Sequence, residues 1–171
     1  MQFAIFNTTW KCFGFVARGR RVVATYLPRC RGEIRRRIVE DWPEAVEASE
    51  LLPKLRRNVL DYFAGRRVRF SAPIDLIDVP PFRREVLERC RRILYGKTAS
   101  YGDLARAVGR DGAARAVGSA MANNPLPLVI PCHRVLRSDG SLGGFSSPEG
   151  TRLKERMLRL EGADIEWLSV A

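Results

Sequence analysis

The period of the hydrophobic residues changes at two adjacent prolines, Pro80 and Pro81, and this change constrains the fold more than any other feature. The first quarter of the chain alternates apolar and polar residues, which is typical of strands, whereas after Pro81 apolar residues recur at helical spacing. Pro73 adds a break just upstream. We therefore predict an α/β N-terminal subdomain over residues 1–80, with a small antiparallel sheet and helices, and a mainly α-helical C-terminal domain over residues 81–171.

Within the first region, alternation predicts strands over residues 2–10, 12–17 and 21–27, the last two forming a hairpin around Gly19. Helical spacing follows over residues 33–42 and 50–64, and Gly65 is placed as a helix C-cap. Alternation returns over residues 67–76, which predicts a further strand.

The C-terminal region begins with one apolar stripe, which predicts a helix after Pro81 and makes Cys90 a core residue. The stripe consists of Phe82, Val86, Leu87, Cys90 and Leu94.

Two further short helices are predicted downstream. Ser100 and Asp103 match a capping box that opens a helix ending at Val108, before Gly109. A second helix covers residues 113–121, where small and apolar residues recur at helical spacing. Two short helices with a tight glycine-containing turn are typical of a helix-turn-helix, here of the winged-helix-like kind.

The outer face of the second helix carries small residues and one arginine: Arg115, Gly118, Ser119 and Ala122. A helix that reads bases in the major groove normally carries long polar side chains. Small residues allow a close backbone approach, as a minor-groove binder needs. Close packing against another element of the protein explains the same pattern, and the sequence alone leaves both interpretations open.

The chain of 171 residues carries a formal net charge of +11, which favours a polyanionic partner, nucleic acid ahead of membrane. A contribution to solubility is the simpler alternative. No apolar run approaches the ~20 residues of a transmembrane helix, so we expect a soluble, cytoplasmic protein. Amides are scarce and arginine is abundant, which hints at a prokaryotic thermophile, although GC-rich coding would also enrich arginine.

Cys132 lies directly before His133, the only histidine in the chain. A thiol becomes a strong nucleophile when it loses its proton, and imidazole is the usual base for that step. Neighbouring side chains on a strand point to opposite faces, so such a pair must lie on a turn or act through a water molecule. A buried cysteine that merely precedes a histidine is the alternative.

The other cysteines are Cys12, Cys30 and Cys90. Their spacing contains no CxxC motif, and with one histidine in the chain we expect no metal site. A Cys12–Cys30 disulfide stays open as a hypothesis, because intracellular disulfides are rare outside hyperthermophiles.

A glycine-rich loop covers residues 138–146 and precedes the last helix. Ser147 is predicted as its N-cap, with Pro148 at the first helical position. The helix is expected to run to Glu161, with Gly162 as its cap.

Taken together, these motifs resemble the O6-alkylguanine-DNA alkyltransferase family, also called methylated-DNA–protein-cysteine methyltransferases. The resemblance covers residues 81–162, and the first eighty residues are similar only in length and α/β pattern, which the family shapes as a ribonuclease-H-like subdomain. Its motifs, in order, are Ser100-Tyr101-Gly102-Asp103-Leu104-Ala105, Ala114-Arg115-Ala116-Val117-Gly118-Ser119-Ala120-Met121, Asn124-Pro125, Ile130-Pro131-Cys132-His133-Arg134-Val135, Gly143-Gly144-Phe145-Ser146 and Leu160-Glu161-Gly162.

The resemblance implies a catalytic role for five residues. Cys132 is the alkyl acceptor, His133 takes its proton through a water molecule, and Glu161 orients the imidazole. Asn124 ties the helix-turn-helix to the active-site turn, and Tyr101 contacts the guanine ring nitrogen.

The resemblance also implies binding residues. Arg115 fills the gap that the extruded nucleotide leaves, on a DNA-binding helix that includes Ala114, Ala116, Gly118 and Ser119. The guanine pocket is implied to contain Tyr101, Met121, Pro127, Val135, Phe145, Ser146 and Lys154. Phe145 stands where many members have tyrosine, and the segment from Phe145 to Glu161 is two residues longer than usual.

The implied activity is DNA repair by irreversible transfer of a methyl or other alkyl group from guanine O6 to Cys132. The target nucleotide must leave the duplex first, because stacked neighbours block the line of attack. The product is a thioether without a carbonyl for water to attack, so we expect one turnover per molecule. We expect no cofactor, a monomer, and double-stranded DNA containing alkylated guanine as the partner.

Overall fold

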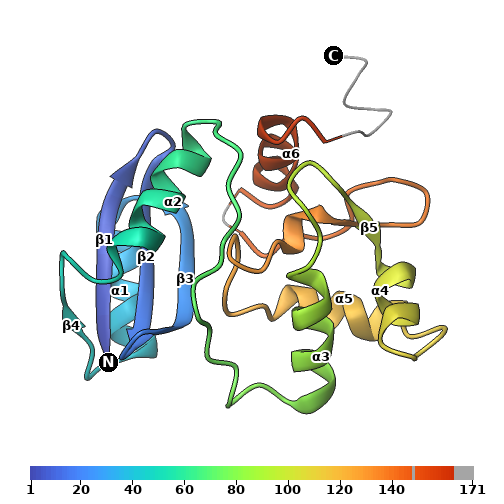
Figure 1. The fold of residues 1–171 in the computed structure, drawn as a ribbon, viewed down its shortest axis with the longest axis horizontal. Coiled ribbons are helices and arrows are strands. Elements are labelled where there is room, and N and C mark those ends of the chain that lie inside the picture. Colours follow the sequence, from blue (N-terminus) through green and yellow to red (C-terminus); the bar gives the residue numbers. More distant parts are fainter. Residues whose placement is uncertain (148, 164–171) are drawn as a thin grey trace. The chain divides into compact units, whose positions relative to one another are not determined.

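The computed structural model describes residues 1–147 and 149–163, and its chain divides into two compact units (Figure 1). The first unit comprises Met1–Ile77 together with Pro125–Val129, and the second comprises Asp78–Asn124 together with the chain from Ile130 onward. No helix among the described residues is both long and apolar enough to cross a membrane.

A four-stranded sheet forms the centre of the first unit, in the order β3-β2-β1-β4. Strands β1 (Gln2–Thr8), β2 (Lys11–Arg18) and β3 (Arg21–Arg29) are antiparallel, and the short β4 (Val46–Glu47) pairs with β1 in parallel. The first strand ends before Trp10, earlier than predicted, because the Thr8 side chain accepts a hydrogen bond from the backbone of Trp10 in a turn.

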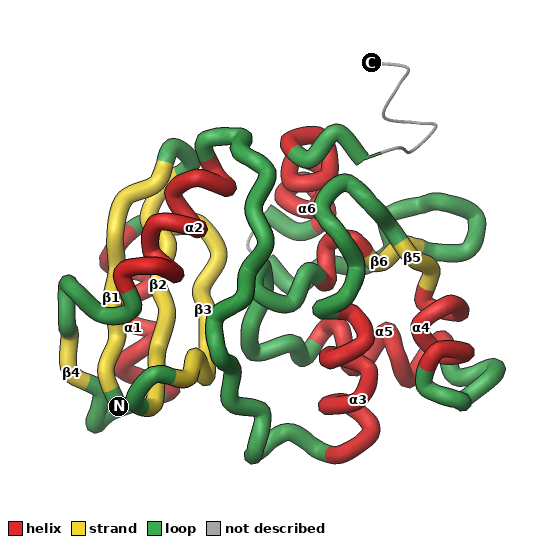
Figure 2. Tube along the Cα trace, viewed as in Figure 1, coloured by secondary structure: helices red, strands yellow, loops and turns green. Residues whose placement is uncertain are grey.

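Both faces of this sheet are buried by helices, as Figure 2 shows for α1 (Arg31–Asp41) and α2 (Pro53–Phe63). Helix α1 contributes Ile34 and Ile38 to a cluster with one face, and Gly14 lets it approach closely, since a Cβ there would lie 2.5 Å from Ile34. On the other face, Phe63 of α2 packs against Phe13, with ring centroids 6.1 Å apart. Burial on both faces explains the near-continuous buried pattern of the strands.

The strand predicted over residues 67–76 is wrong, because the described structure has only an isolated bridge there, between Val22 and Ile74. Pro73 has no N–H to donate to a ladder, and its carbonyl accepts from Val22. The alternation instead reflects the burial of Phe70 and Leu76 along an irregular segment.

The second unit is mainly helical. Its helices are α3 (Pro81–Cys90), α4 (Tyr101–Ala107), α5 (Ala114–Ala122) and α6 (Thr151–Leu160). A parallel pair of short strands, β5 (Ala99–Ser100) and β6 (Val135–Leu136), accompanies them. The predicted helix-turn-helix is present as α4 and α5, and the capping box of Ser100 and Asp103 opens α4.

Two details of the helical prediction are wrong. Helix α3 ends at Cys90, which is fully buried, so Leu94 lies beyond the apolar stripe and is exposed. Helix α6 begins at Thr151, because the backbone of Gly150 turns at φ 55° and its N–H bonds to Ser147. Ser147 therefore lies in that turn rather than at the N-cap, and Pro148 lies outside the described residues.

Candidate active site

The turn Cys132–Arg134 is a single turn of 3-10 helix, which settles how the two adjacent side chains are arranged. The backbone N–H of Cys132 donates to Ile130 at 2.8 Å, and that of Arg134 donates to Pro131 at 2.9 Å. Cys132, His133 and Arg134 are all buried. The chain is therefore not extended here, and the alternation that would separate neighbouring side chains does not apply.

Asn124 connects the end of α5 to this turn. Its side-chain amide donates to the carbonyl of Ile130 at 3.0 Å. The same side chain forms a hydrogen bond with the Cys132 thiol that lowers the pKa of Cys132. Asn124 thus contacts both the backbone that shapes the turn and the sulfur itself.

Behind the cysteine lies a buried charge network centred on Glu161, the residue that follows α6. Its carboxylate bonds to Nε2 of His133 at 2.7 Å and accepts two bonds from the Arg134 guanidinium, at 2.9 and 3.0 Å. The backbone N–H of Gly96 adds a further bond at 3.0 Å. Burial alone would raise the pKa of Glu161, but His133 and Arg134 hold it well below its usual range. Glu161 is therefore ionised at neutral pH.

Burial sets the protonation of the two reactive groups. It raises the pKa of Cys132, and the lowering by Asn124 and by the Lys154 charge does not cancel this effect. Burial likewise lowers the pKa of His133, against the opposing influence of Glu161. The resting pair is therefore a thiol and a neutral imidazole at neutral pH, because a dry site penalises both charged forms.

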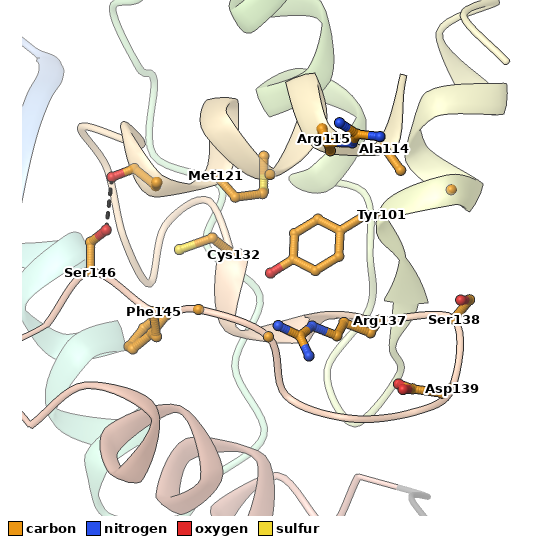
Figure 3. Close-up of a pocket in the computed structure, with 15 residues that line it drawn as sticks. Tyr101, Ala114, Arg115, Met121, Cys132, Arg137, Ser138, Asp139, Phe145 and Ser146 are labelled. Atoms are coloured by element: carbon orange, nitrogen blue, oxygen red, sulfur yellow. Dashed lines mark hydrogen bonds between the residues drawn. The ribbon is translucent and has the colours of Figure 1, made fainter. Parts of the chain in front are cut away.

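A cavity of about 670 Å³ opens onto the cysteine (Figure 3). This volume is within the usual range for small-molecule pockets. The cavity is lined by Tyr101, Gly102, Ala114, Arg115, Gly118, Met121, Ala122, Cys132, Arg137, Ser138, Asp139, Gly143, Gly144, Phe145 and Ser146. Cys132 is the only thiol in this lining set, so a ligand in the cavity would meet this sulfur and no other.

Four of the residues implied for the guanine pocket line this cavity, namely Tyr101, Met121, Phe145 and Ser146. The hydroxyl of Ser146 donates to the carbonyl of Ala122 at 3.0 Å, which joins the glycine-rich loop to the end of α5 (Figure 3).

Val135, Lys154 and Pro127 do not line the cavity. Val135 is fully buried, and Pro127 belongs to the first unit, where its carbonyl accepts from Thr25. Lys154 is fully buried, and its ammonium donates to the carbonyls of Val135 and Leu142. Placing Lys154 beside the bound guanine is therefore not supported, because α6 turns this side chain into the core. Burial lowers its pKa to about 8.

The outer face of α5 is open. Arg115, Ala116 and Ser119 are exposed, and Ala114 and Gly118 are partly so. Within the described residues this face is not covered by another element, which favours contact with a ligand over internal packing as the reason for its small residues.

Sequence reasoning missed several residues of the site. Arg137, Ser138 and Asp139 line the cavity from the turn after β6, and Gly143 and Gly144 line it from the glycine-rich loop. The proximity of this loop to the cysteine in sequence was a usable signal, but no spacing rule distinguishes Arg137 from the other arginines. Arg134 belongs to the Pro-Cys-His-Arg-Val motif, but its place in the buried network depends on the tertiary structure.

Fold and site together define a helix-turn-helix protein with a pocket whose wall contains one cysteine, and this cysteine is buried and hydrogen-bonded. A family model described as "6-O-methylguanine DNA methyltransferase, DNA binding domain" matches residues 81–163. The constitutive methylated-DNA–protein-cysteine methyltransferase of Bacillus subtilis is 38% identical over 126 residues, covering 71% of this chain and 75% of that protein. A DNA base-flipping protein of Thermus thermophilus is 45% identical over 122 residues, covering 71% and 79%.

Among solved structures, Mycobacterium tuberculosis OGT in complex with DNA is similar over 95% of this chain and 93% of that chain, with a TM-score of 0.80 and 26% identity. The O6-methylguanine-DNA methyltransferase of Pyrococcus kodakaraensis has a TM-score of 0.71 at 28% identity and covers 94% and 99%. The chain belongs to the methylated-DNA–protein-cysteine methyltransferase family.

Proposed function

We propose that this protein repairs DNA by transferring an alkyl group from O6 of an extruded guanine to the sulfur of Cys132. The observation that carries this proposal is the position of Cys132, which lines a cavity of about 670 Å³ in the unit that contains the helix-turn-helix. A thiolate is a soft anionic nucleophile and suits displacement at an alkyl carbon. Membership of the family gives the reaction class.

His133 acts as the base and Glu161 as the group that orients and compensates it. Because Glu161 bonds to Nε2, the Cys132 proton goes to Nδ1, by way of a water molecule. The imidazolium formed is stabilised by the ionised carboxylate 2.7 Å away. Burial raises the pKa of Cys132 and lowers that of His133, which disfavours the ion pair at rest.

The target base enters from the open face of α5. Arg115 is exposed at the edge of the cavity and occupies the gap in the duplex. Extruding a nucleotide costs a few kcal/mol, and phosphate contacts by a chain of net charge +11 offset that cost. Met121 and Phe145 contact the base with apolar groups, Ser146 lies beside its oxygen, and Tyr101 reaches its ring nitrogen.

Double-stranded DNA with alkylated guanine is the substrate, and one chain reacts once, because a thioether resists hydrolysis. We propose further that the protein acts as a cytoplasmic monomer. Sedimentation of the free protein and of its complex with a duplex checks the stoichiometry, and a dimer in either would contradict it.

The decisive experiment is incubation with a duplex containing O6-methylguanine, followed by mass spectrometry of the Cys132 peptide. We expect one methyl group per chain on Cys132 and no transfer to Cys132→Ala, which keeps its affinity for DNA. Cys90→Ala is the matched control, because Cys90 is buried on α3 and does not line the cavity.

A second candidate function is recognition of damage without transfer. The relative from Thermus thermophilus, named a DNA base-flipping protein, favours it, as does the raised pKa of Cys132. The same experiment separates the two, because a protein that only binds would retain the lesion in the duplex and leave Cys132 unmodified.

A further inference from the structure

Arg137 is a pocket residue that no step described so far uses. The cavity is lined by two arginines, Arg115 and Arg137. They lie on opposite sides of Tyr101 in Figure 3, with Arg115 on α5 and Arg137 on the turn after β6. Arg115 is proposed to contact the duplex, whereas Arg137 lies on the side of the Tyr101 ring away from α5.

The short parallel ladder of β5 and β6 brings together the two chain segments that carry Tyr101 and Arg137. Ala99 pairs with Val135 and Ser100 with Leu136, so the next residues along the two strands are Tyr101 and Arg137. The turn that follows is closed at both ends, because the Arg137 N–H donates to Ser141 at 2.9 Å and the Gly140 N–H donates to Arg137 at 3.0 Å. Asp139, the acidic residue of this turn, accepts from the backbone of Ser141 at 2.9 Å. These bonds fix the backbone of Arg137, whose side chain lines the same cavity as Tyr101.

Two glycines leave room for the Tyr101 ring in the cavity. A Cβ added at Gly143 would lie 2.8 Å from the Tyr101 hydroxyl, and one at Gly118 would lie 4.0 Å from its ring. In Figure 3 the hydroxyl points toward the part of the cavity that contains Cys132. The charged and titratable groups that act on this phenol are Cys132, Arg137 and Cys90, and the Lys154 ammonium lies 5.8 Å from the ring centroid. Burial and the Cys132 thiol raise the pKa of Tyr101, and Arg137 opposes them.

Alkyl transfer requires an acid near the guanine ring nitrogen, because the departing purine must take up a proton. The bond from Cys132 sulfur to the alkyl carbon forms while the bond from that carbon to O6 breaks, and its electron pair stays on the guanine. The purine then takes a proton at a ring nitrogen and leaves as neutral guanine. The proton that Cys132 loses through His133 balances the one that the phenol donates and regains from solvent.

We propose that Arg137 is a positioning residue whose guanidinium strengthens Tyr101 as the acid that protonates the departing guanine. This inference rests on the proposed function and extends it to the leaving group. A cation beside a phenol stabilises the phenolate, and transfer from a stronger acid lowers the barrier for expulsion of the base.

The test uses a free alkylated base, O6-benzylguanine, so that contacts with DNA phosphates play no part. The rate of Cys132 benzylation is measured across pH for wild type, Arg137→Met, Arg137→Lys, Tyr101→Phe and the double variant Tyr101→Phe/Arg137→Met. Arg137→Met should slow the reaction roughly 3- to 10-fold, while Arg137→Lys keeps most of the rate. In the Tyr101→Phe background, Arg137→Met should cause no further loss. Arg92→Met is the matched control, because Arg92 is exposed in the same unit away from the cavity, and it should react like wild type.

The outcomes separate cleanly. An unchanged rate for Arg137→Met, or equal losses with and without the Tyr101 hydroxyl, overturns the inference and leaves the proposed function intact. A loss seen only with duplex DNA assigns Arg137 to phosphate binding and also overturns it. If Cys132 of the wild-type protein takes up no benzyl group and no methyl group from a duplex, the proposed function itself fails. Thermal melting of each variant confirms that it is folded.

Discussion

The two sides of Cys132 use charge in opposite ways. Behind the sulfur, His133, Glu161, Arg134 and Lys154 are buried, and each is hydrogen-bonded to a named partner. In front of it, Arg115 and Arg137 are exposed on a cavity wall that also contains glycines. Buried charges are costly unless fully paired, so the rear network tolerates little change, whereas the front wall can change with small cost to the fold. The comparison predicts that stability depends on the rear and substrate handling on the front.

The largest effect is expected for Glu161→Gln. This change leaves the Arg134 guanidinium buried without its counter-charge, so the free energy of unfolding should fall by about 3–5 kcal/mol. Transfer should fall at least about a hundredfold, because His133 loses its compensating charge. Chemical denaturation and single-turnover kinetics measure the two effects. Glu155→Gln, which breaks only the exposed pair with Arg159, should cost less than about 1 kcal/mol.

Glu161 should also make the free energy of unfolding depend on pH in the acid range. The folded pKa of Glu161 is held well below its unfolded value of about 4.3. A depressed carboxylate contributes its full stability above the unfolded pKa and loses it as pH falls toward the folded one. Wild type should therefore lose stability below about pH 4.3 more steeply than Glu161→Gln. Parallel slopes for the two proteins would remove Glu161 as the source.

The next largest effect is expected for Lys154→Met, which removes a buried positive charge that influences the Cys132 thiol. The folded pKa of Lys154 is about 8, below the unfolded value of about 10.4, so wild-type stability should rise between these two pH values. The variant should lack this rise. Because the ammonium also lowers the pKa of Cys132, the variant should need a higher pH for alkylation. Unfolding and alkylation rates, each followed against pH, check the two parts, and an unchanged pH profile for alkylation would contradict the second.

Sequence and structure agree best where one local pattern decides. The periodicity predicts α3, α4 and α5 and the hairpin of β2 and β3, because burial on one side of a helix and short turns are local properties. The failures come from tertiary context. Residues 67–76 alternate without forming a ladder, and a sequence cannot show whether a strand partner exists. The resemblance implies that Lys154 lies in the guanine pocket, but the direction of its side chain depends on the residue at which α6 begins.

The site shows the same division. The single histidine beside Cys132 makes the pair a candidate on chemistry, and the family resemblance then implies its roles. Glu161 comes from the family resemblance, and its bond to His133 is then found in the structure. Arg134 and Arg137 differ only in what surrounds them, a buried carboxylate for one and an open cavity for the other. The chain contains 30 lysines and arginines, so composition alone does not show which arginines belong to the site.

On the front side, Arg115→Ala should affect duplex DNA and spare small substrates. The side chain is exposed at the cavity edge, so its loss should leave the melting temperature and the reaction with free O6-benzylguanine unchanged. Repair of a duplex should slow by about tenfold, since an unfilled gap leaves the extruded state less stable by about 1.4 kcal/mol. Equal slowing on both substrates would contradict this role. Arg110→Ala, in the turn between α4 and α5, is the comparison variant for a general loss of positive charge.

The smallest effect is expected for Ser146→Ala, which asks how firmly the front wall must be held. The Ser146 hydroxyl donates to the carbonyl of Ala122 at 3.0 Å, and the side chain is exposed. Water can replace the lost donor at an exposed site, so the free energy of unfolding should change by less than about 1 kcal/mol. The transfer rate should change by less than about threefold, because the Ser146 hydroxyl donates to Ala122 and therefore does not donate to the guanine oxygen beside it. Kinetics with duplex DNA resolve this difference. A loss as large as that of Glu161→Gln would mean that the glycine-rich loop is as tightly constrained as the buried network, and the contrast between the two sides would not hold.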